Sequence, residues 1–206
     1  GPDSWPRHLR RHSWREQAAG RRRPGSTSGP PMWPEPRQPP AQRHRIGTAR
    51  DAPLFLSDGL NYVGIDLSHN MLDVARKNFT DCLIADVNPI MHVFQMNMHE
   101  FGFRKHSIDG FWAVTSFMHI AKEALPRVLS ALKAVIKPDG IGFISIPRGT
   151  FVGMYSNDPE RLPTFVACWM EDELCSVLEQ SGFQILLCDV VYKMVIVIVS
   201  VSGIAD

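Results

Sequence analysis

An apolar segment that ends in a single acid and runs directly into a helix constrains this chain more than any other feature. The segment is 62–67, with Asp66 near its end, and Ser68 is placed to cap a helix that starts at His69. In open α/β sheets this arrangement brings a carboxylate to the carboxyl edge, where ribose hydroxyls can donate to it. The sequence therefore predicts a nucleotide-like cofactor beside Asp66.

Strand-like and helix-like segments alternate from residue 51 onward. Short apolar runs predict strands at 62–67, 93–98, 108–114, 141–146, 183–192 and 194–201. Apolar stripes and capping residues predict helices at 51–59, 69–79, 121–136 and 171–181. This order predicts a mostly parallel, doubly wound α/β sheet, and the tight turn near Lys193 predicts an antiparallel C-terminal strand pair.

The first 45 residues differ in composition from the rest. They hold nine prolines and show no apolar periodicity, so we expect a disordered leader before one compact domain at 46–206. Residues 1–50 carry eleven Arg against three acids, whereas the rest carries eleven basic and eighteen acidic residues. Arg21–Arg23 could contact nucleic-acid phosphates, but a solvated leader is the simpler interpretation.

Cysteine usage and hydropathy indicate a reduced, cytoplasmic protein. The four cysteines show no C-x-x-C pair and no metal-ligand spacing, so we expect neither disulfides nor a metal site. The apolar run 194–201 is shorter than the roughly 20 residues that a bilayer requires, and β-branched residues dominate it. It is predicted to be a core strand, and no membrane partner is expected.

Four motifs then follow one another at regular intervals. They are Val63-Gly-Ile-Asp-Leu-Ser68 with Met71-Leu72, Phe94-Gln-Met-Asn-Met98, Asp109-Gly-Phe-Trp-Ala113 with Ser116–Ile120, and Leu132–Gly140 with its Lys-Pro-Asp-Gly turn. Together they make residues 47–201 resemble a class I S-adenosylmethionine-dependent methyltransferase of the small-molecule type, similar to methyltransferase types 11 and 25. The resemblance implies a Rossmann-like sheet, S-adenosylmethionine as cofactor and a small-molecule methyl acceptor.

The resemblance also implies a set of cofactor contacts. Asp66, with Leu67 beside it, would accept from the ribose, and Met71 would lie against the adenine. Asn97 stands where relatives place an acid for the adenine amino group, and Met98 would offer its backbone N–H. The implied cofactor-binding residues are Gly47, Asp66, Leu67, Met71, Asn97, Met98, Val114 and Thr115.

The first motif of this family is degenerate here. Relatives have a buried central strand and a glycine-rich loop, but only Gly47 remains of the glycines, and Arg45 and Ala49 occupy other loop positions. Pro39-Pro40 and the charged residues after it are incompatible with a central strand. We therefore expect the first strand to be missing and its two neighbours, the second and fourth strands of the family, to lack a partner.

Three functions remain open from the sequence. The chain could be an active methyltransferase, an impaired derivative with weak or no cofactor binding, or an RNA-associated methyltransferase that uses its basic leader. No catalytic residue is assigned. His119 could act as a general base or only orient the following helix, and Trp112 could pack in the sheet or support an acceptor. Gly149, Tyr155 and Arg161 fall in the expected acceptor loop.

Overall fold

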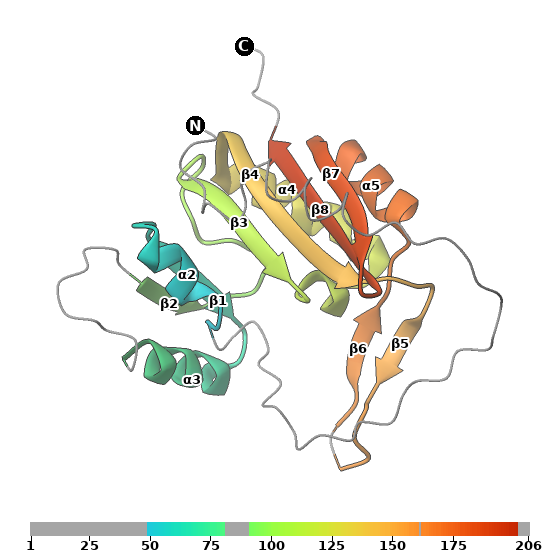
Figure 1. The fold of residues 1–206 in the computed structure, drawn as a ribbon, viewed down its shortest axis with the longest axis horizontal. Helices are drawn as coiled ribbons and strands as arrows, with labels where there is room; N and C mark the ends of the chain where they lie inside the picture. The colour runs from blue at the N-terminus through green and yellow to red at the C-terminus, as the bar shows by residue number, and fades with distance from the viewer. Residues whose placement is uncertain (1–48, 81–90, 161, 202–206) are drawn as a thin grey trace, which may run out of the picture.

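The computed structural model describes residues 49–80, 91–160 and 162–201, in which helices and strands alternate (Figure 1). The leader and Gly47 lie outside these residues. A smaller part contains α2 (Ala52–Ser57), β1 (Tyr62–Asp66), α3 (His69–Thr80) and β2 (Met91–Gln95). The larger part contains β3 (Ile108–Val114), η4 (Phe117–His119), η5 (Lys122–Ala124), α4 (Leu125–Val135), β4 (Ile136–Pro147), β5 (Val152–Tyr155), β6 (Thr164–Ala167), α5 (Glu171–Gln180), β7 (Phe183–Val191) and β8 (Met194–Val201).

The larger part is built on a four-stranded sheet with the order β3-β4-β8-β7. β3 and β4 are parallel, whereas β8 runs antiparallel to both β4 and β7. The antiparallel C-terminal strand pair predicted from the sequence is therefore present. β8 lies inside this sheet, and β7 forms its edge.

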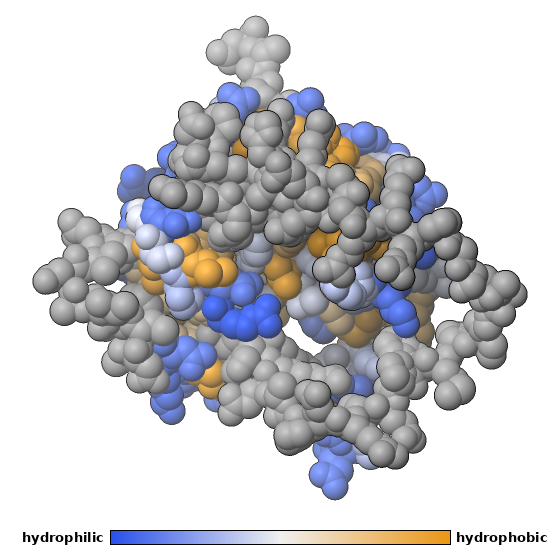
Figure 2. Space-filling view, viewed as in Figure 1, coloured by the Kyte–Doolittle hydropathy of each residue, from blue (hydrophilic) through white to orange (hydrophobic). Residues whose placement is uncertain are grey.

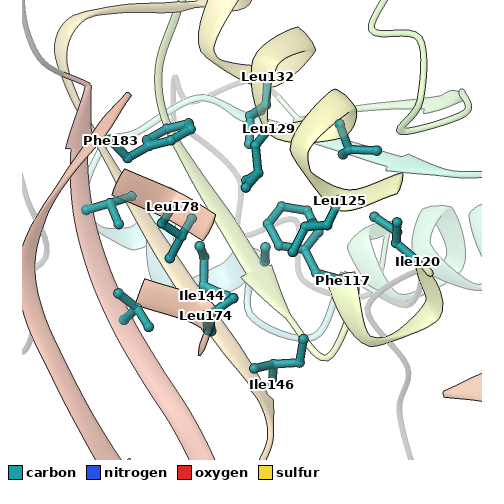
Figure 3. Packing of buried hydrophobic residues seen from close by; sticks show 14 of the residues in the cluster. Phe117, Ile120, Leu125, Leu129, Leu132, Ile144, Ile146, Leu174, Leu178 and Phe183 are labelled. Carbon is teal, nitrogen blue, oxygen red and sulfur yellow. The ribbon is translucent and has the colours of Figure 1, made fainter. Parts of the chain in front are cut away.

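Two helices bury one face of this sheet. The apolar stripe of α4 contributes Leu125, Val128, Leu129 and Leu132 to a core in which Ile144 of β4 is fully buried. In β8, alternate residues are buried, as expected for a strand with one face on the core. Figure 3 shows these side chains converging between α4, α5 and the sheet. Each large aliphatic side chain buried here contributes about 1.5–3 kcal/mol.

The smaller part is a separate two-stranded sheet. β1 and β2 are parallel and pair from Tyr62 with Met91 to Asp66 with Gln95. Within the described residues, no strand pairs with the other edge of β1 or with the outer edge of β3. The sheet is thus interrupted at the position where the sequence predicts a missing central strand.

Helix α2 connects the two sheets through aromatic contacts. The ring centroid of Phe55 lies 5.8 Å from that of Tyr62 in β1 and 5.3 Å from that of Trp112 in β3. The Trp112 indole Nε1 donates to Asp51 Oδ2 at 3.0 Å, and the indole stacks on Phe143 at 4.1 Å. Trp112 therefore packs beside the sheet, which was one of the two roles open from the sequence.

Three differences from the sequence-based elements affect the site. A hairpin of β5 and β6 occupies the region expected to be a loop, with Met154 opposite Phe165. β2 is two residues earlier than predicted at its start and ends at Gln95, so Asn97 and Met98 follow the strand. β4 includes the predicted turn, because Ile136 already pairs with Ile108 and the register shifts before Ile141.

In the part of the chain that the structure describes, no helix is both long and apolar enough to cross a membrane.

Candidate functional site

Asp66 is the last residue of β1, and its side chain is half-buried. Its Oδ1 accepts a hydrogen bond from the backbone N–H of Ser68 at 2.7 Å, which fixes the carboxylate against the turn into α3. Among the described residues, no donor contacts Oδ2. The carboxylate therefore keeps one oxygen available for a ligand hydroxyl at the end of the strand.

Hydrogen bonds from α3 and from β2 hold the turn after Asp66. Met71 N–H lies 3.1 Å from the Ser68 carbonyl oxygen and 3.4 Å from Ser68 Oγ, as the predicted cap requires. The Leu67 carbonyl accepts from Gln95 Nε2 at 2.9 Å, so the side chain that ends β2 supports the turn after β1. Leu67 is 60% exposed and Met71 is half-buried, so neither side chain is sealed in the core.

Asn97 lies in the turn after β2 and is exposed. Its Oδ1 accepts from the backbone N–H of His99 at 3.0 Å, and its carbonyl accepts from Glu100 N–H at 3.0 Å. The amide oxygen thus already has a partner, whereas the amide nitrogen is a donor. Met98 packs against the core of the four-stranded sheet. Asn97 is therefore held by hydrogen bonds within its own turn, whereas Met98 is held by packing against the core.

Thr115 follows β3 and has a strained backbone. Its φ of 52° lies in the left-handed region that β-branched residues rarely adopt. The conformation is held by a 2.7 Å hydrogen bond from Thr115 N–H to the carbonyl of Ser145 in β4, beside the last paired residue of β3, Val114. The cofactor role of Val114 and Thr115 stays a prediction, since His106, Asp139, Tyr192 and Lys193 also have a positive φ.

Ala49, which precedes α2, also has a left-handed backbone conformation. Its φ is 53°, and its carbonyl accepts from Ala52 N–H at 3.0 Å, so the backbone is left-handed at this residue. The alanine is 8% exposed. The Cβ at this position adds about 1–2 kcal/mol of strain, since left-handed backbone brings Cβ close to the following carbonyl.

Sequence reasoning missed Asp51 and Tyr62. Asp51 accepts from Trp112 at 3.0 Å and from Arg50 Nε at 3.2 Å. Burial and, to a smaller extent, the nearby Asp51 carboxylate together raise the pKa of Tyr62 to about 12. Both residues belong to the contact region between the two sheets, which Asp51, Phe55, Tyr62 and Trp112 form and which we call the seam. No motif marks them, because their proximity depends on how α2 packs.

His119 lies at the end of η4, just beyond β3. Its Nδ1 is 2.8 Å from the carbonyl oxygen of Phe165 in β6, and its side chain is exposed. Lys122, three residues later, forms an ion pair with Glu173 of α5 at 2.6 Å. Tyr155 of β5 is exposed, and Gly149 has a φ of 150° near the start of the hairpin. Arg161 lies outside the described residues.

The mixed α/β sheet, in which β1 pairs with β2 and β3 with β4 in parallel and β8 is antiparallel, matches the fold of the class I methyltransferases. Residues 46–140 match the model of the methyltransferase domain. A comparison with curated proteins gives no significant match. The chain therefore has the class I methyltransferase fold, and residues 46–140 are similar to a methyltransferase domain, a family whose cofactor is S-adenosylmethionine.

Solved structures agree on the fold. An S-adenosylmethionine-dependent methyltransferase from Methanosarcina mazei is 14% identical, with a TM-score of 0.66 over 77% of this chain and 90% of that one. The 1,6-didemethyltoxoflavin-N1-methyltransferase from Burkholderia thailandensis is 18% identical, with a TM-score of 0.60 over 77% and 68%. The [4+2]-cyclase SpnF is 15% identical, with a TM-score of 0.60 over 77% and 72%.

Proposed function

We propose that this protein is an S-adenosylmethionine-dependent methyltransferase that acts on a small-molecule acceptor. The single observation that carries the proposal is the half-buried Asp66 carboxylate, which ends β1; one oxygen accepts from Ser68 N–H, and the other has no donor among the described residues. Ligands of open α/β sheets bind outside the carboxyl ends of the strands. A carboxylate held there suits two ribose hydroxyls, because each can donate a charge-assisted hydrogen bond.

Other described residues fit the same cofactor. Leu67 and Met71 provide apolar surface beside Asp66, and the strained Thr115 lies just beyond β3. Bound S-adenosylmethionine would supply a methyl group on a sulfonium, so the protein mainly has to position the acceptor. The Burkholderia thailandensis methyltransferase, whose structure contains 1,6-didemethyltoxoflavin and S-adenosylhomocysteine, supports a small-molecule acceptor by analogy of fold.

A second function is favoured by Ala49 and by the interrupted sheet. The left-handed Ala49 carries a Cβ where a glycine would let the backbone approach the ligand, and among the described strands β1 and β3 each lack a partner on one side. These features favour an impaired methyltransferase with weak cofactor binding. The fold also hosts chemistry other than methyl transfer, as SpnF shows by its name, so binding must be measured first.

Calorimetric titration with S-adenosylhomocysteine separates the two functions. Asp66→Ala should weaken binding by about tenfold or more, because hydrogen bonds to a charged group contribute roughly 1.5–3 kcal/mol each. Asp66→Asn is the matched variant, since its amide oxygen can still accept from Ser68 N–H while the charge is lost. Asp73→Asn, an exposed acid on α3 that pairs with Arg76, serves as control and should leave binding unchanged.

The outcomes differ clearly. Weakening by Asp66→Asn, with Asp73→Asn unaffected, supports recognition of ribose by the charged carboxylate. Equal affinity of the wild type and Asp66→Ala would contradict the proposed site. The absence of binding to the wild type would favour the impaired form, and Ala49→Gly would then be expected to restore part of the affinity.

A further inference from the structure

Two cysteine thiols meet where α5 packs on the edge strand β7. Cys175 lies in the middle of α5 and packs against the core of the four-stranded sheet. Cys188 lies in β7, and a side-chain hydrogen bond joins the two thiols. Figure 1 shows α5 alongside β7 at this edge of the sheet. Both cysteines are free, so two unmodified thiols are in contact across the boundary between helix and strand.

An irregularity in β7 turns Cys188 toward the helix. Ile185 pairs with Val199 of β8. Cys188, three residues later in β7, pairs with Val197, which is only two residues earlier in β8, so β7 holds one extra residue between the two pairs. Opposite residues of an antiparallel pair project from the same face, and Val197 is completely buried in the core that the helices cover. Without the extra residue, the alternation of the strand would place Cys188 on the other face.

The two thiols differ in how readily a reagent from solvent reaches them. Cys188 is exposed, whereas Cys175 is half-buried. Burial first, and then the hydrogen bond and the charge of Cys188, raise the pKa of the Cys175 thiol above its ordinary value. The thiolate is the nucleophile in thiol–disulfide exchange, so Cys175 reacts slowly with an external reagent. Cys188 is therefore the thiol that meets an oxidant first.

We infer that Cys175 and Cys188 form a reversible modification site, which a low-molecular-weight disulfide closes into a bridge between α5 and β7. The site needs only the contact of the two thiols, so it does not depend on methyl transfer. Ring closure is favoured because the second thiol is held beside the first. In a reducing compartment both residues stay thiols, so the bridge is expected only when the disulfide fraction of the thiol pool rises.

The exchange is balanced by the disulfide itself, here glutathione disulfide. Cys188 loses its proton, and its sulfur attacks one sulfur of the reagent, whose S–S bond breaks and releases one glutathione thiolate. Capping Cys188 removes its hydrogen bond and its charge, which are two of the causes that raise the pKa of Cys175. The Cys175 sulfur then gives up its proton, attacks the Cys188 sulfur and releases the second glutathione. Two protein thiols are oxidised, and one disulfide is reduced to two thiols that take up the two protons.

The bridge would fasten the edge strand to its helix. β7 has only β8 as a strand partner among the described residues, so α5 is its other support. The amino end of α5 is held by two ion pairs, from Glu171 to Arg148 at 2.8 Å and from Glu173 to Lys122 at 2.6 Å. No ion pair joins α5 to β7 in the described part of the chain, so the bridge adds a link that this contact lacks.

Peptide mapping of the full chain tests the bridge without any substitution. The protein would be incubated with glutathione disulfide, alkylated, digested without reductant and analysed by mass spectrometry. We expect a peptide that joins Cys175 to Cys188, about 2 Da lighter than the two reduced peptides together, and its loss with dithiothreitol. Cys168 and Cys82, the latter outside the described residues, are internal controls and should stay unbridged. A glutathione adduct that persists on Cys188 without a bridge would overturn the inference, and so would a bridge from Cys188 to Cys82.

Serine variants test the order of the two steps. Cys175→Ser should stop the reaction at a glutathione adduct on Cys188. Cys188→Ser should abolish the bridge and leave Cys175 modified more slowly than Cys188 is in the wild type, because burial still raises its pKa. Cys168→Ser is the matched control and should form the bridge unchanged. Equally rapid modification of Cys175 in the Cys188→Ser protein would overturn the assignment of Cys188 as the first thiol.

Discussion

The four-stranded sheet and the β1–β2 pair are stabilised very differently. The larger sheet buries Leu129, Ile144 and Val197 completely, whereas no residue of β1 or β2 is buried. In the smaller part Val63 and Phe94 remain 39% and 44% exposed, and Figure 2 shows hydrophobic surface over the region of α2, β1 and β2. Yet the predicted cofactor acid, Asp66, belongs to this open part. The acid proposed to bind the cofactor thus lies in the part of the molecule with the weaker core.

This comparison explains why parallel strands need partners on both sides. Parallel sheets are normally covered on both faces and paired along both edges, which allows nearly every strand residue to be buried. β1 pairs only with β2 among the described strands, so its side chains stay half-exposed. The antiparallel β8, paired on both edges, reaches full burial at Val195, Val197 and Val199.

The largest predicted difference is in unfolding free energy. Leu129→Ala removes a fully buried side chain from α4 and should cost about 2–5 kcal/mol in urea unfolding. Val63→Ala, at a position 39% exposed on β1, should cost less than about 1 kcal/mol. Similar losses of unfolding free energy for the two variants would show that β1 is packed as well as the larger sheet, and would contradict the difference in stability between the two parts.

A pH series would examine the seam between the two sheets. The pKa of Tyr62 is about 12 in the folded protein and 10 in the unfolded chain. As the pH rises from 10 toward 12, only the unfolded chain loses this proton, so stability should fall by roughly 2–3 kcal/mol. Tyr62→Phe should lose correspondingly less over the same interval. Parallel loss in both proteins would show that Tyr62 is exposed and that α2 does not seal the seam.

The smallest effects concern two alanines that are three residues apart. Ala49→Gly should raise the unfolding free energy by up to about 1 kcal/mol, because glycine adopts a φ of 53° without strain. Ala52→Gly, in the first turn of α2, should lower it by about 0.5–1 kcal/mol. Urea denaturation measures both. Changes of the same sign would mean that the turn before α2 is not held in the left-handed region.

Much of the fold could be predicted from local pattern. The apolar stripe of α4 predicts a helix and the β-branched run of β8 predicts a strand, and the structure confirms both. The β5–β6 hairpin was missed because its strands have four residues each and one contains Gly153. Its position depends on the distant contact between His119 and Phe165, which no local window contains.

The site could be predicted from the sequence only at the end of β1, where the acid, the capping serine and the helix follow one another directly. Asp66 and the cap at Ser68 are local features; the structure has the expected cap, and the cofactor role of Asp66 stays a prediction. The link between Asp51 and Trp112 spans 61 positions, and neither residue belongs to a periodic pattern that would reveal it. The cofactor role of Asn97 stays a prediction, with its amide oxygen already engaged by His99 N–H.

The place of β8 in the sheet has a consequence for biosynthesis. β8 lies between β4 and β7, so β7 has no other strand partner among the described residues. During translation β7 leaves the ribosome first and must wait for residues 194–201 before it can pair. The larger sheet therefore closes only after β8 has emerged, and the apolar residues of β7 remain open to chaperones until then. Ribosome-bound chains that stop before β8 should consequently behave as unfolded clients.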